Sequence, residues 1–62
     1  MHQPPLAYSI NEAAEAAGLG RDSIYGAISE GRLRARKYGK RTLVLHTDLQ
    51  AFLEALPRLG VA

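Results

Sequence analysis

The sequence has no cysteine and no tryptophan, and nowhere do 18 apolar residues follow one another. Without cysteine, neither a disulfide nor a thiolate metal site can support the fold. No stretch is long and apolar enough to predict a transmembrane helix, and residues 1–5 lack the basic start and apolar run of a signal peptide. We therefore expect no membrane association and a cytoplasmic protein whose fold depends on packing alone.

With 62 residues the chain can form one domain with one small core. Residues 1–7 contain two prolines and show no hydrophobic period, so we expect a flexible N-terminal arm there. The folded domain is predicted over residues 8–56, and residues 57–62 form a short C-terminal tail.

Acidic residues are missing from one part of the chain. Residues 31–47 contain six basic and no acidic side chains, whereas the rest contains two basic and six acidic ones. The net charge of +2 hides this division. Since an ordinary surface interleaves both signs of charge, the basic segment predicts contact with an acidic partner.

A capping box opens the first predicted helix. Ser9 and Glu12 have the spacing at which each side chain satisfies a free backbone amide of the other. Apolar residues then recur with a helical period over residues 10–17, and Gly18 is placed to end the helix.

A second amphipathic helix is predicted over residues 21–30, with Gly20 as its N-cap and Gly31 as its stop. The two helices are separated by a turn of three residues that contains glycine. This arrangement is typical of a helix-turn-helix, whose second helix can enter the DNA major groove. A helical hairpin without a ligand is the alternative.

The helical period then gives way to strand-forming residues. We predict strands over residues 33–38 and 41–45, joined by a type II′ turn at Gly39-Lys40. Leu33 and Leu43 are candidates to attach these strands to the core.

A third helix is predicted over residues 48–56. Thr47 and Gln50 have capping-box spacing at its start, and Pro57 would close it. The predicted fold class is thus mainly α with a small β-hairpin, a winged helix-turn-helix in which the hairpin is the wing.

If the apolar side of the second helix is buried in the core, its other side faces solvent. The candidate DNA-binding residues of this recognition helix are Arg21, Asp22, Ser23, Tyr25, Gly26 and Ser29. Arg21 is the best candidate for a bidentate contact to guanine, and Gly26 permits close approach. Asp22 either accepts a hydrogen bond from cytosine or stabilises the positive end of the helix.

The wing supplies the remaining candidates, which are Arg32, Arg34, Arg36, Lys37, Lys40 and Arg41. Lys40 and Arg41 would reach a phosphate strand or the minor groove, and the others would neutralise flanking phosphates. If about four phosphates are neutralised, the logarithm of the binding constant falls with the logarithm of salt concentration with a slope near −3.6.

The stretch YSINEAAEAAGLGRDSIYGAISEGRLRARKYGKRTLVLHTDLQAFLEAL, residues 8–56, resembles the helix-turn-helix domains of excisionases and phage AlpA-like proteins, which are relatives of the MerR DNA-binding domain. The similar motifs are the SINEAA opening, Gly18, the SIY and EGRL motifs, the GKR wing tip and the closing DLxAFL. The resemblance implies DNA contacts from Arg21, Ser23, Tyr25, Lys37, Lys40 and Arg41. Gly20 and Thr42 depart from it, because relatives usually have a serine or threonine cap and often a large aromatic there.

Domains of this kind act as recombination directionality factors beside an integrase or as small transcriptional regulators. The resemblance implies double-stranded DNA as the partner, with an integrase or recombinase, or further copies of the chain, as additional partners. It also implies a prokaryotic or phage-encoded, nucleoid-associated protein. No small-molecule effector is expected, since the chain ends before an effector domain.

An enzyme is the weakest alternative. His2 lies in the arm, His46 stands alone, and Glu12 and Glu15 are explained by capping and the helix dipole. We expect no catalytic residues, metal site or cofactor.

A serious rival is a protein-interaction adaptor that docks on an integrase or the transcription machinery through the third helix and the tail. Leu59 and Val61 are apolar in a segment without helical period. The sequence has no heptad repeat of the kind that forms a stable coiled-coil dimer, so we expect a monomer that assembles cooperatively on DNA.

Overall fold

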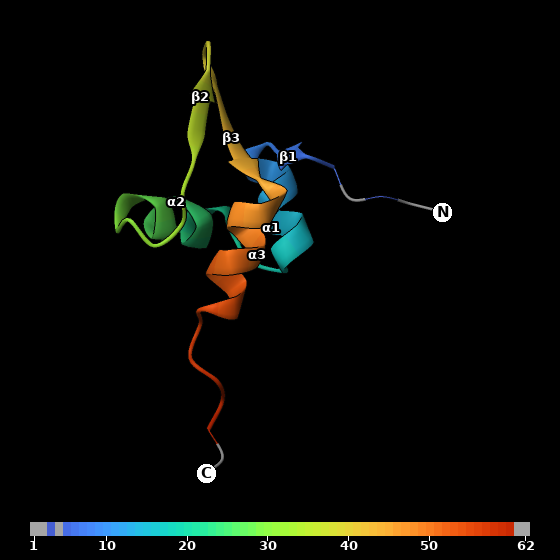
Figure 1. The fold of residues 1–62 in the computed structure, drawn as a ribbon. Coiled ribbons are helices and arrows are strands. Elements are labelled where there is room, and N and C mark those ends of the chain that lie inside the picture. Colours follow the sequence, from blue (N-terminus) through green and yellow to red (C-terminus); the bar gives the residue numbers. More distant parts are fainter. Residues whose placement is uncertain (1–2, 4, 61–62) are drawn as a thin grey trace.

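The computed structural model describes residue 3 and residues 5–60. Along the chain lie β1 (Ala7–Tyr8), α1 (Ile10–Ala17), α2 (Arg21–Ser29), β2 (Arg36–Tyr38), β3 (Arg41–Leu45) and α3 (His46–Glu54). The three helices form a body, and the β2–β3 hairpin projects from it (Figure 1). This is the predicted winged helix-turn-helix.

Helix α1 has the predicted bounds and the predicted cap. The Glu12 amide donates to Ser9 Oγ at 3.2 Å, and the Ser9 amide donates to Glu12 Oε1 at 2.9 Å. Gly18 follows with a φ of 71°, a left-handed conformation that glycine adopts at little cost. The amide of Leu19 then donates to Ala14 O at 2.9 Å and closes the helix end.

Helix α2 begins after Gly20, which caps it without a side-chain hydrogen bond. It ends at Ser29, one residue before the predicted end, and Gly31 has a φ of 78°. The amide of Arg32 turns back to Ala27 O at 2.9 Å. The predicted glycine stop is therefore confirmed.

The wing turns at Gly39 and Lys40, as predicted. Tyr38 pairs with Arg41, so only two residues connect the strands. Gly39 has a φ of 60°, and no non-glycine residue in the described part has a positive φ. A positive φ at the first central position alone is the pattern of a type II′ turn.

Strand β2 starts at Arg36, so the predicted start at residue 33 is wrong. The amide of Leu33 donates to Ala27 O at 3.2 Å, and its side chain is buried against the helices. Because that amide completes the end of α2, Leu33 belongs to the connection rather than to the ladder.

Strand β1 was not among the predicted elements, and Ala7 falls within the predicted arm. Ala7 pairs with Leu45 and Tyr8 with Val44, both antiparallel, so β3 lies between β1 and β2. A strand of two residues is too short to show a sequence period, which is why it was missed.

Helix α3 starts at His46 after Leu45 as N-cap, so the predicted capping box at Thr47 and Gln50 is wrong. The reason is the neighbouring β1 segment. The amide of His46 donates to Leu6 O at 2.9 Å, and Tyr8 Oη lies 3.0 Å from His46 Nδ1. The bond to Leu6 O satisfies the first amide of the helix, which starts two residues earlier than a Thr47 cap would allow, and the Tyr8 contact fixes the His46 side chain beside it.

The end of α3 also differs from the prediction. The helix stops at Glu54, with Ala55 as its C-cap, instead of continuing to residue 56. Leu56 precedes Pro57, and a residue before proline is disfavoured in the α conformation. Pro57 therefore ends α3 two residues before the predicted end at residue 56.

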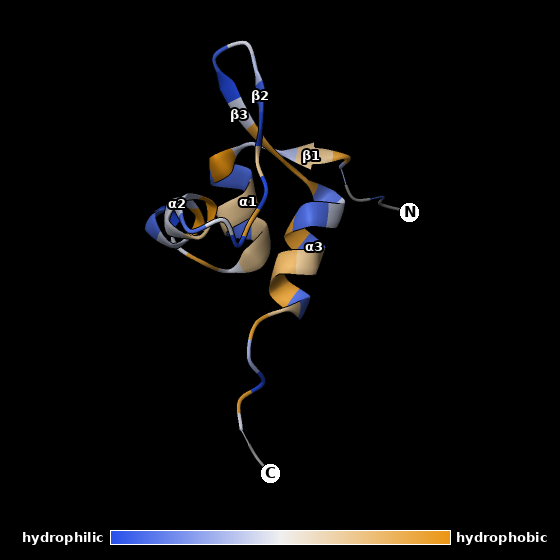
Figure 2. Ribbon diagram, turned by 60° about the vertical axis from the view of Figure 1, so that its left-hand side comes forward, coloured by the Kyte–Doolittle hydropathy of each residue, from blue (hydrophilic) through white to orange (hydrophobic). Residues whose placement is uncertain are grey.

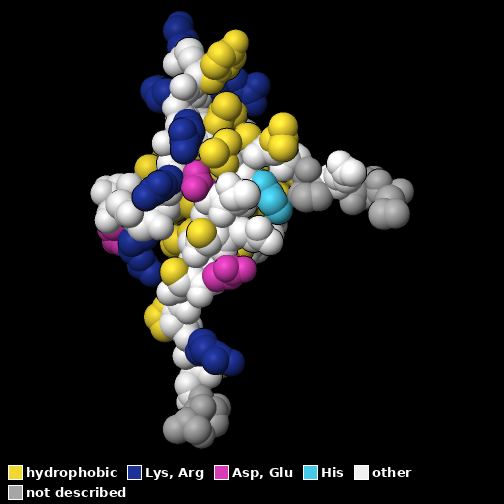
Figure 3. Space-filling model, viewed as in Figure 1, with side chains coloured by type: hydrophobic (Ala, Val, Ile, Leu, Met, Phe, Trp, Pro, Cys, Tyr) yellow, Lys and Arg dark blue, Asp and Glu magenta, His cyan; other side chains and the backbone are white. Residues whose placement is uncertain are grey.

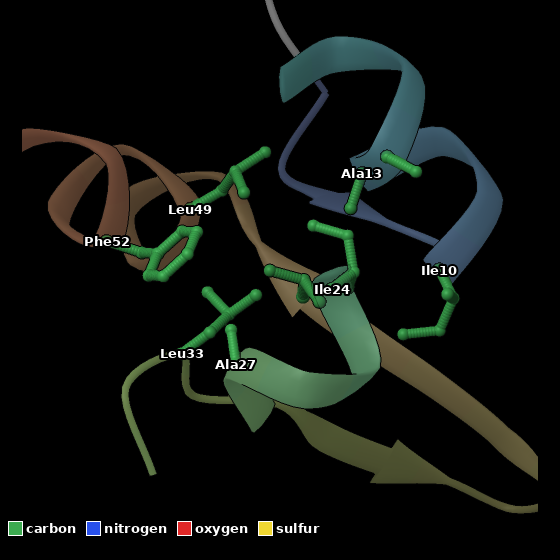
Figure 4. Close-up of a cluster of buried hydrophobic side chains, with 9 residues drawn as sticks. Ile10, Ala13, Ile24, Ala27, Leu33, Leu49 and Phe52 are labelled. Carbon is green, nitrogen blue, oxygen red and sulfur yellow. The ribbon is translucent and has the colours of Figure 1, made fainter. Parts of the chain in front are cut away.

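Nine buried apolar side chains from all three helices, β3 and the α2–β2 connection form the core (Figure 4). Its largest fully buried members are Ile24, Leu33 and Val44. Val44 takes the role predicted for Leu43, because side chains alternate along a strand and Leu43 lies on the other face. Figure 2 shows that β2, unlike this core, is hydrophilic, and that the turn of the wing ranges from intermediate to hydrophilic.

Candidate nucleic-acid interface

The outward side of α2 carries the predicted recognition residues. Five of the six are exposed and Gly26 is half-buried; the exposed ones are Arg21, Asp22, Ser23, Tyr25 and Ser29. Tyr25 keeps 48% of its surface exposed, which is unusual for so large a side chain in a body this small. The side of α2 opposite the core is therefore available to a partner.

Arg21 and Tyr25 form one edge of that side. The guanidinium carbon of Arg21 lies 6.0 Å from the centroid of the Tyr25 ring, at the outer limit of a cation–π contact. Arg21 is also the first residue of α2, where the helix dipole is positive and disfavours a cation. Packing and electrostatics within the chain thus give little reason for an arginine here.

Ser23 lies on the opposite edge of α2. It borders a hollow of about 350 Å³ together with Leu19, Phe52 and Leu56. Ser23 therefore faces the α3 side of the body rather than the edge of Arg21. The structure does not bring these two predicted contacts together.

Gly26 lies between the two edges. A Cβ added at Gly26 would meet no atom within 4 Å. Packing inside the chain therefore does not require glycine at this position, although glycine weakens a helix interior. The position leaves the helix backbone open to close approach from outside.

Every residue of the wing from 36 to 41 is exposed, and four of these six residues are cationic. Thr42 is two residues from the buried Val44 on β3 and shares its face, and its cross-strand partner is Lys37. Arg36 and Tyr38 alternate with Lys37 and pair with Leu43 and Arg41. The wing thus presents cations on both of its faces.

The wing and α2 meet at a shallow hollow of about 260 Å³. Its lining residues come from the start of α1, the first turns of α2 and the wing, and they are Ser9, Ile10, Asn11, Arg21, Tyr25, Lys40, Arg41 and Thr42. The structure therefore brings predicted recognition and wing residues to one place. Ser9 and Asn11 were not among the predicted site residues, because only the folded chain places the start of α1 beside the wing.

Arg32 and Arg34 lie outside the wing, in the connection between α2 and β2, so their assignment to the hairpin is wrong. Arg32 Nη1 is 3.5 Å from Glu30 Oε1, an exposed ion pair, and its guanidinium carbon is 6.0 Å from the Phe52 ring centroid. Arg34 borders a hollow with Asp48, whose Oδ2 is buried and has no hydrogen-bond partner among the described residues. Both arginines have acidic neighbours, unlike the wing cations.

Tyr38 is an exposed residue that was not among the predicted site residues. It keeps 77% of its surface exposed beside the wing turn. An aromatic residue adjacent to a basic turn was a signal that could have found it, since aromatic rings and cations together favour nucleic-acid contact.

The distribution of charge follows this geometry. Figure 3 shows basic side chains along the wing and down the side of the body near α2, with acidic side chains on the body. Within residues 3 and 5–60, no group of three or more metal-ligating side chains lies close enough to hold an ion. No helix in that part is long and apolar enough to cross a membrane.

An exposed basic wing beside the first turn of an outward-facing second helix defines a winged helix-turn-helix of the DNA-binding class. A family model described as a helix-turn-helix domain matches residues 7–57. The chain belongs to this family, and the resemblance to excisionase and AlpA-like domains is confirmed. No curated protein and no solved structure matches the chain significantly.

Proposed function

We propose that the chain is a sequence-specific duplex DNA-binding protein of the excisionase type, acting as a recombination directionality factor or as a small phage-type transcriptional regulator. In this proposal α2 enters the major groove and the wing lies on the backbone and minor groove. The observation that carries it is the hollow where Arg21 and Tyr25 of α2 meet Lys40 and Arg41 of the wing.

The hollow suits one sugar–phosphate strand. Arg21 lies on the α2 side and Lys40 on the wing side, while Ser9 and Asn11 add hydrogen-bonding groups between them. A strand in this position has the major groove on its α2 side and the minor groove on its wing side. Both elements can then contact the same duplex without any change in the fold.

The residues divide into two roles. In this proposal Arg21 and Tyr25 contact base edges, and Asp22, Gly26 and Ser29 face the floor or walls of the groove; the exposure of the outward side of α2 supports this. Ser23 lies on the far edge of α2, and we assign it to the flanking phosphate strand.

The wing anchors the complex through Arg36, Lys37, Lys40 and Arg41. Arg32 and Arg34 contribute less, because Arg32 must give up its ion pair with Glu30 to reach a phosphate.

A single module of this size covers little DNA, so useful affinity requires several copies side by side or a DNA-bound integrase or recombinase. We therefore infer a monomer that assembles cooperatively on DNA in the cytoplasm, associated with the nucleoid. The role is non-enzymatic and needs no cofactor or small-molecule effector.

One observation favours a second function, an adaptor that docks on an integrase or the transcription machinery. Leu59 is 98% exposed, and Phe52 and Leu56 of the α3 region border an open hollow. These residues lie away from the wing tip. Ser23 and Gly26 border the same hollow, so a protein partner held there would adjoin the DNA surface of α2.

Titration of a random-sequence duplex by fluorescence anisotropy at a series of salt concentrations tests the proposal. We expect binding at low salt that weakens with a logarithmic slope near −3.6, corresponding to about four phosphates. The absence of duplex binding at the lowest salt would leave the adaptor as the better account. Binding that does not respond to salt would remove the anchoring role of the wing.

A further inference from the structure

The most exposed aromatic side chain of the described residues stands at the most basic point of the molecule. Tyr38 is 77% exposed, directly before the Gly39-Lys40 turn, and pairs across the hairpin with Arg41. The described cation–π contacts involve Tyr25 and Phe52, and neither involves Tyr38. The ring is therefore free of the core and of the neighbouring guanidinium groups.

The face on which Tyr38 lies decides what it can meet. Alternation along β2 and β3 puts Tyr38 on the face of Arg36 and Leu43, opposite to Lys37 and Thr42. Thr42 borders the hollow shared with α2. Arg41, the cross-strand partner of Tyr38, borders it as well, whereas Tyr38 is not among its lining residues. Tyr38 therefore stands outside that hollow.

This placement has a direct consequence if a phosphate strand occupies the hollow. The wing then stands on the minor-groove side of that strand, and Tyr38, outside the hollow, lies beside the groove itself. The minor groove is about 6 Å wide, which admits a flat ring but not a helix. Tyr38 is the one large apolar side chain at the tip that could enter it.

We propose that Tyr38 is an aromatic wedge that inserts into the minor groove and stacks at a base step of the bound duplex. Side chains used in this way partly unstack the bases and kink the duplex, and their energetic cost is lowest at flexible pyrimidine–purine steps. Tyr38 thereby gives the wing a sequence preference that its cations lack. This inference rests on the proposed duplex binding.

A protein partner is the competing occupant of the same face. Figure 3 shows hydrophobic side chains along the wing with basic side chains on either side. The flanking cations Arg36 and Arg41 favour a polyanion over an ordinary apolar protein surface, since a protein partner would have to compensate both charges. Nucleic acid satisfies the cations and the ring together.

The test uses the full chain and a duplex that wild-type protein selects from a random-sequence pool. Each guanine in it is replaced in turn by inosine, which removes the minor-groove amino group and leaves the major-groove edge unchanged. We expect wild-type affinity to change at one or two positions under the wing. Tyr38→Ala should lose affinity by about 5- to 100-fold, as for loss of base–aromatic stacking, and should not respond to inosine at those positions.

Two further readouts separate a wedge from other roles. Aminopurine placed at the responsive step should brighten with wild-type protein, because unstacking relieves its quenching, and should stay dark with Tyr38→Ala. Tyr38→Phe keeps the ring and should behave as wild type. Tyr38→Val keeps strand propensity without the ring and should behave as Tyr38→Ala, with an unchanged thermal midpoint.

Leu6→Ala is the matched control, because it removes another highly exposed apolar side chain away from the wing tip. Its duplex binding should equal that of wild type. Equal binding by Tyr38→Ala and wild type on every duplex would overturn the inference, as would full activity of Tyr38→Val or failure of Tyr38→Phe. Loss of cooperativity alone would assign Tyr38 to a protein contact. Absence of wild-type duplex binding would instead refute the proposed function itself.

Discussion

The body and the wing of this molecule use their side chains in opposite ways. The nine buried apolar residues lie in the three helices, in β3 and at Leu33, whereas every residue from 36 to 41 is exposed. The body contains all six described acidic residues, and the tip contains none. Packing therefore explains the sequence of the body, and it explains almost nothing about the sequence of the wing tip.

This contrast shows where function is encoded in a small domain. The wing is attached to the body through Val44, which is fully buried on β3, and by the pairing of β3 with β1. Since the base of the hairpin is held in this way, its tip is free to carry charges and an aromatic ring that stabilise no core. The first turn of α2 has the same freedom at Arg21 and Tyr25.

The largest expected effect comes from the centre of the body. Ile24→Ala should lower the free energy of unfolding by about 2–5 kcal/mol, because it leaves a cavity where the side chain is fully buried. In the wing, Lys37→Ala should change it by less than about 0.5 kcal/mol. Urea denaturation followed by circular dichroism measures both, and a similar loss in both variants would erase the distinction between body and wing.

A smaller effect is expected at the wing turn. Gly39→Ala meets no neighbouring atom, but a φ of 60° is strained for alanine, at a cost of about 1–2 kcal/mol. The change should lower the thermal midpoint and, by altering the tip, also weaken duplex binding. Gly60→Ala, which also meets nothing within 4 Å, is the control and should leave both unchanged. An unaltered midpoint in Gly39→Ala would show that the turn adapts.

The smallest expected stability change has the opposite sign. Gly26→Ala should stabilise α2 by about 0.5–1 kcal/mol, because alanine suits a helix interior and its Cβ meets nothing. Duplex affinity should nevertheless fall, since the added methyl group stands between the helix backbone and the groove. Thermal unfolding and anisotropy measure the two effects. Stabilisation without loss of affinity would mean that DNA does not approach α2 at this point.

The body could be predicted from the sequence where the signals are local. The capping box of Ser9 and Glu12, the glycine stops and the period of the first two helices all lie within a few residues of one another. The start of α3 could not be predicted in this way. It depends on a hydrogen bond from His46 to Leu6, a residue 40 positions earlier in the chain.

The candidate site could likewise be predicted only in part from the sequence. The sequence identified the cations of the wing and the outward residues of α2, but their common hollow exists only after folding. Ser9 and Asn11 line the hollow because α1 starts beside the wing. Arg32 and Arg34 do not line it, because Leu33 between them is buried in the core. Strand β1 could not be predicted, since a strand of two residues is too short to show a hydrophobic period.

In the proposed division of roles, Arg21 of α2 reads a base and the cations of the wing supply affinity that does not depend on sequence. Binding of Arg21→Ala and Lys40→Ala to a selected duplex and to an unrelated one, at several salt concentrations, tests it most directly. We predict that Arg21→Ala loses about 1–3 kcal/mol of discrimination at one base pair. Lys40→Ala should weaken both duplexes alike and flatten the salt slope by about 0.9. Equal effects of the two substitutions on specificity and on slope would contradict the account.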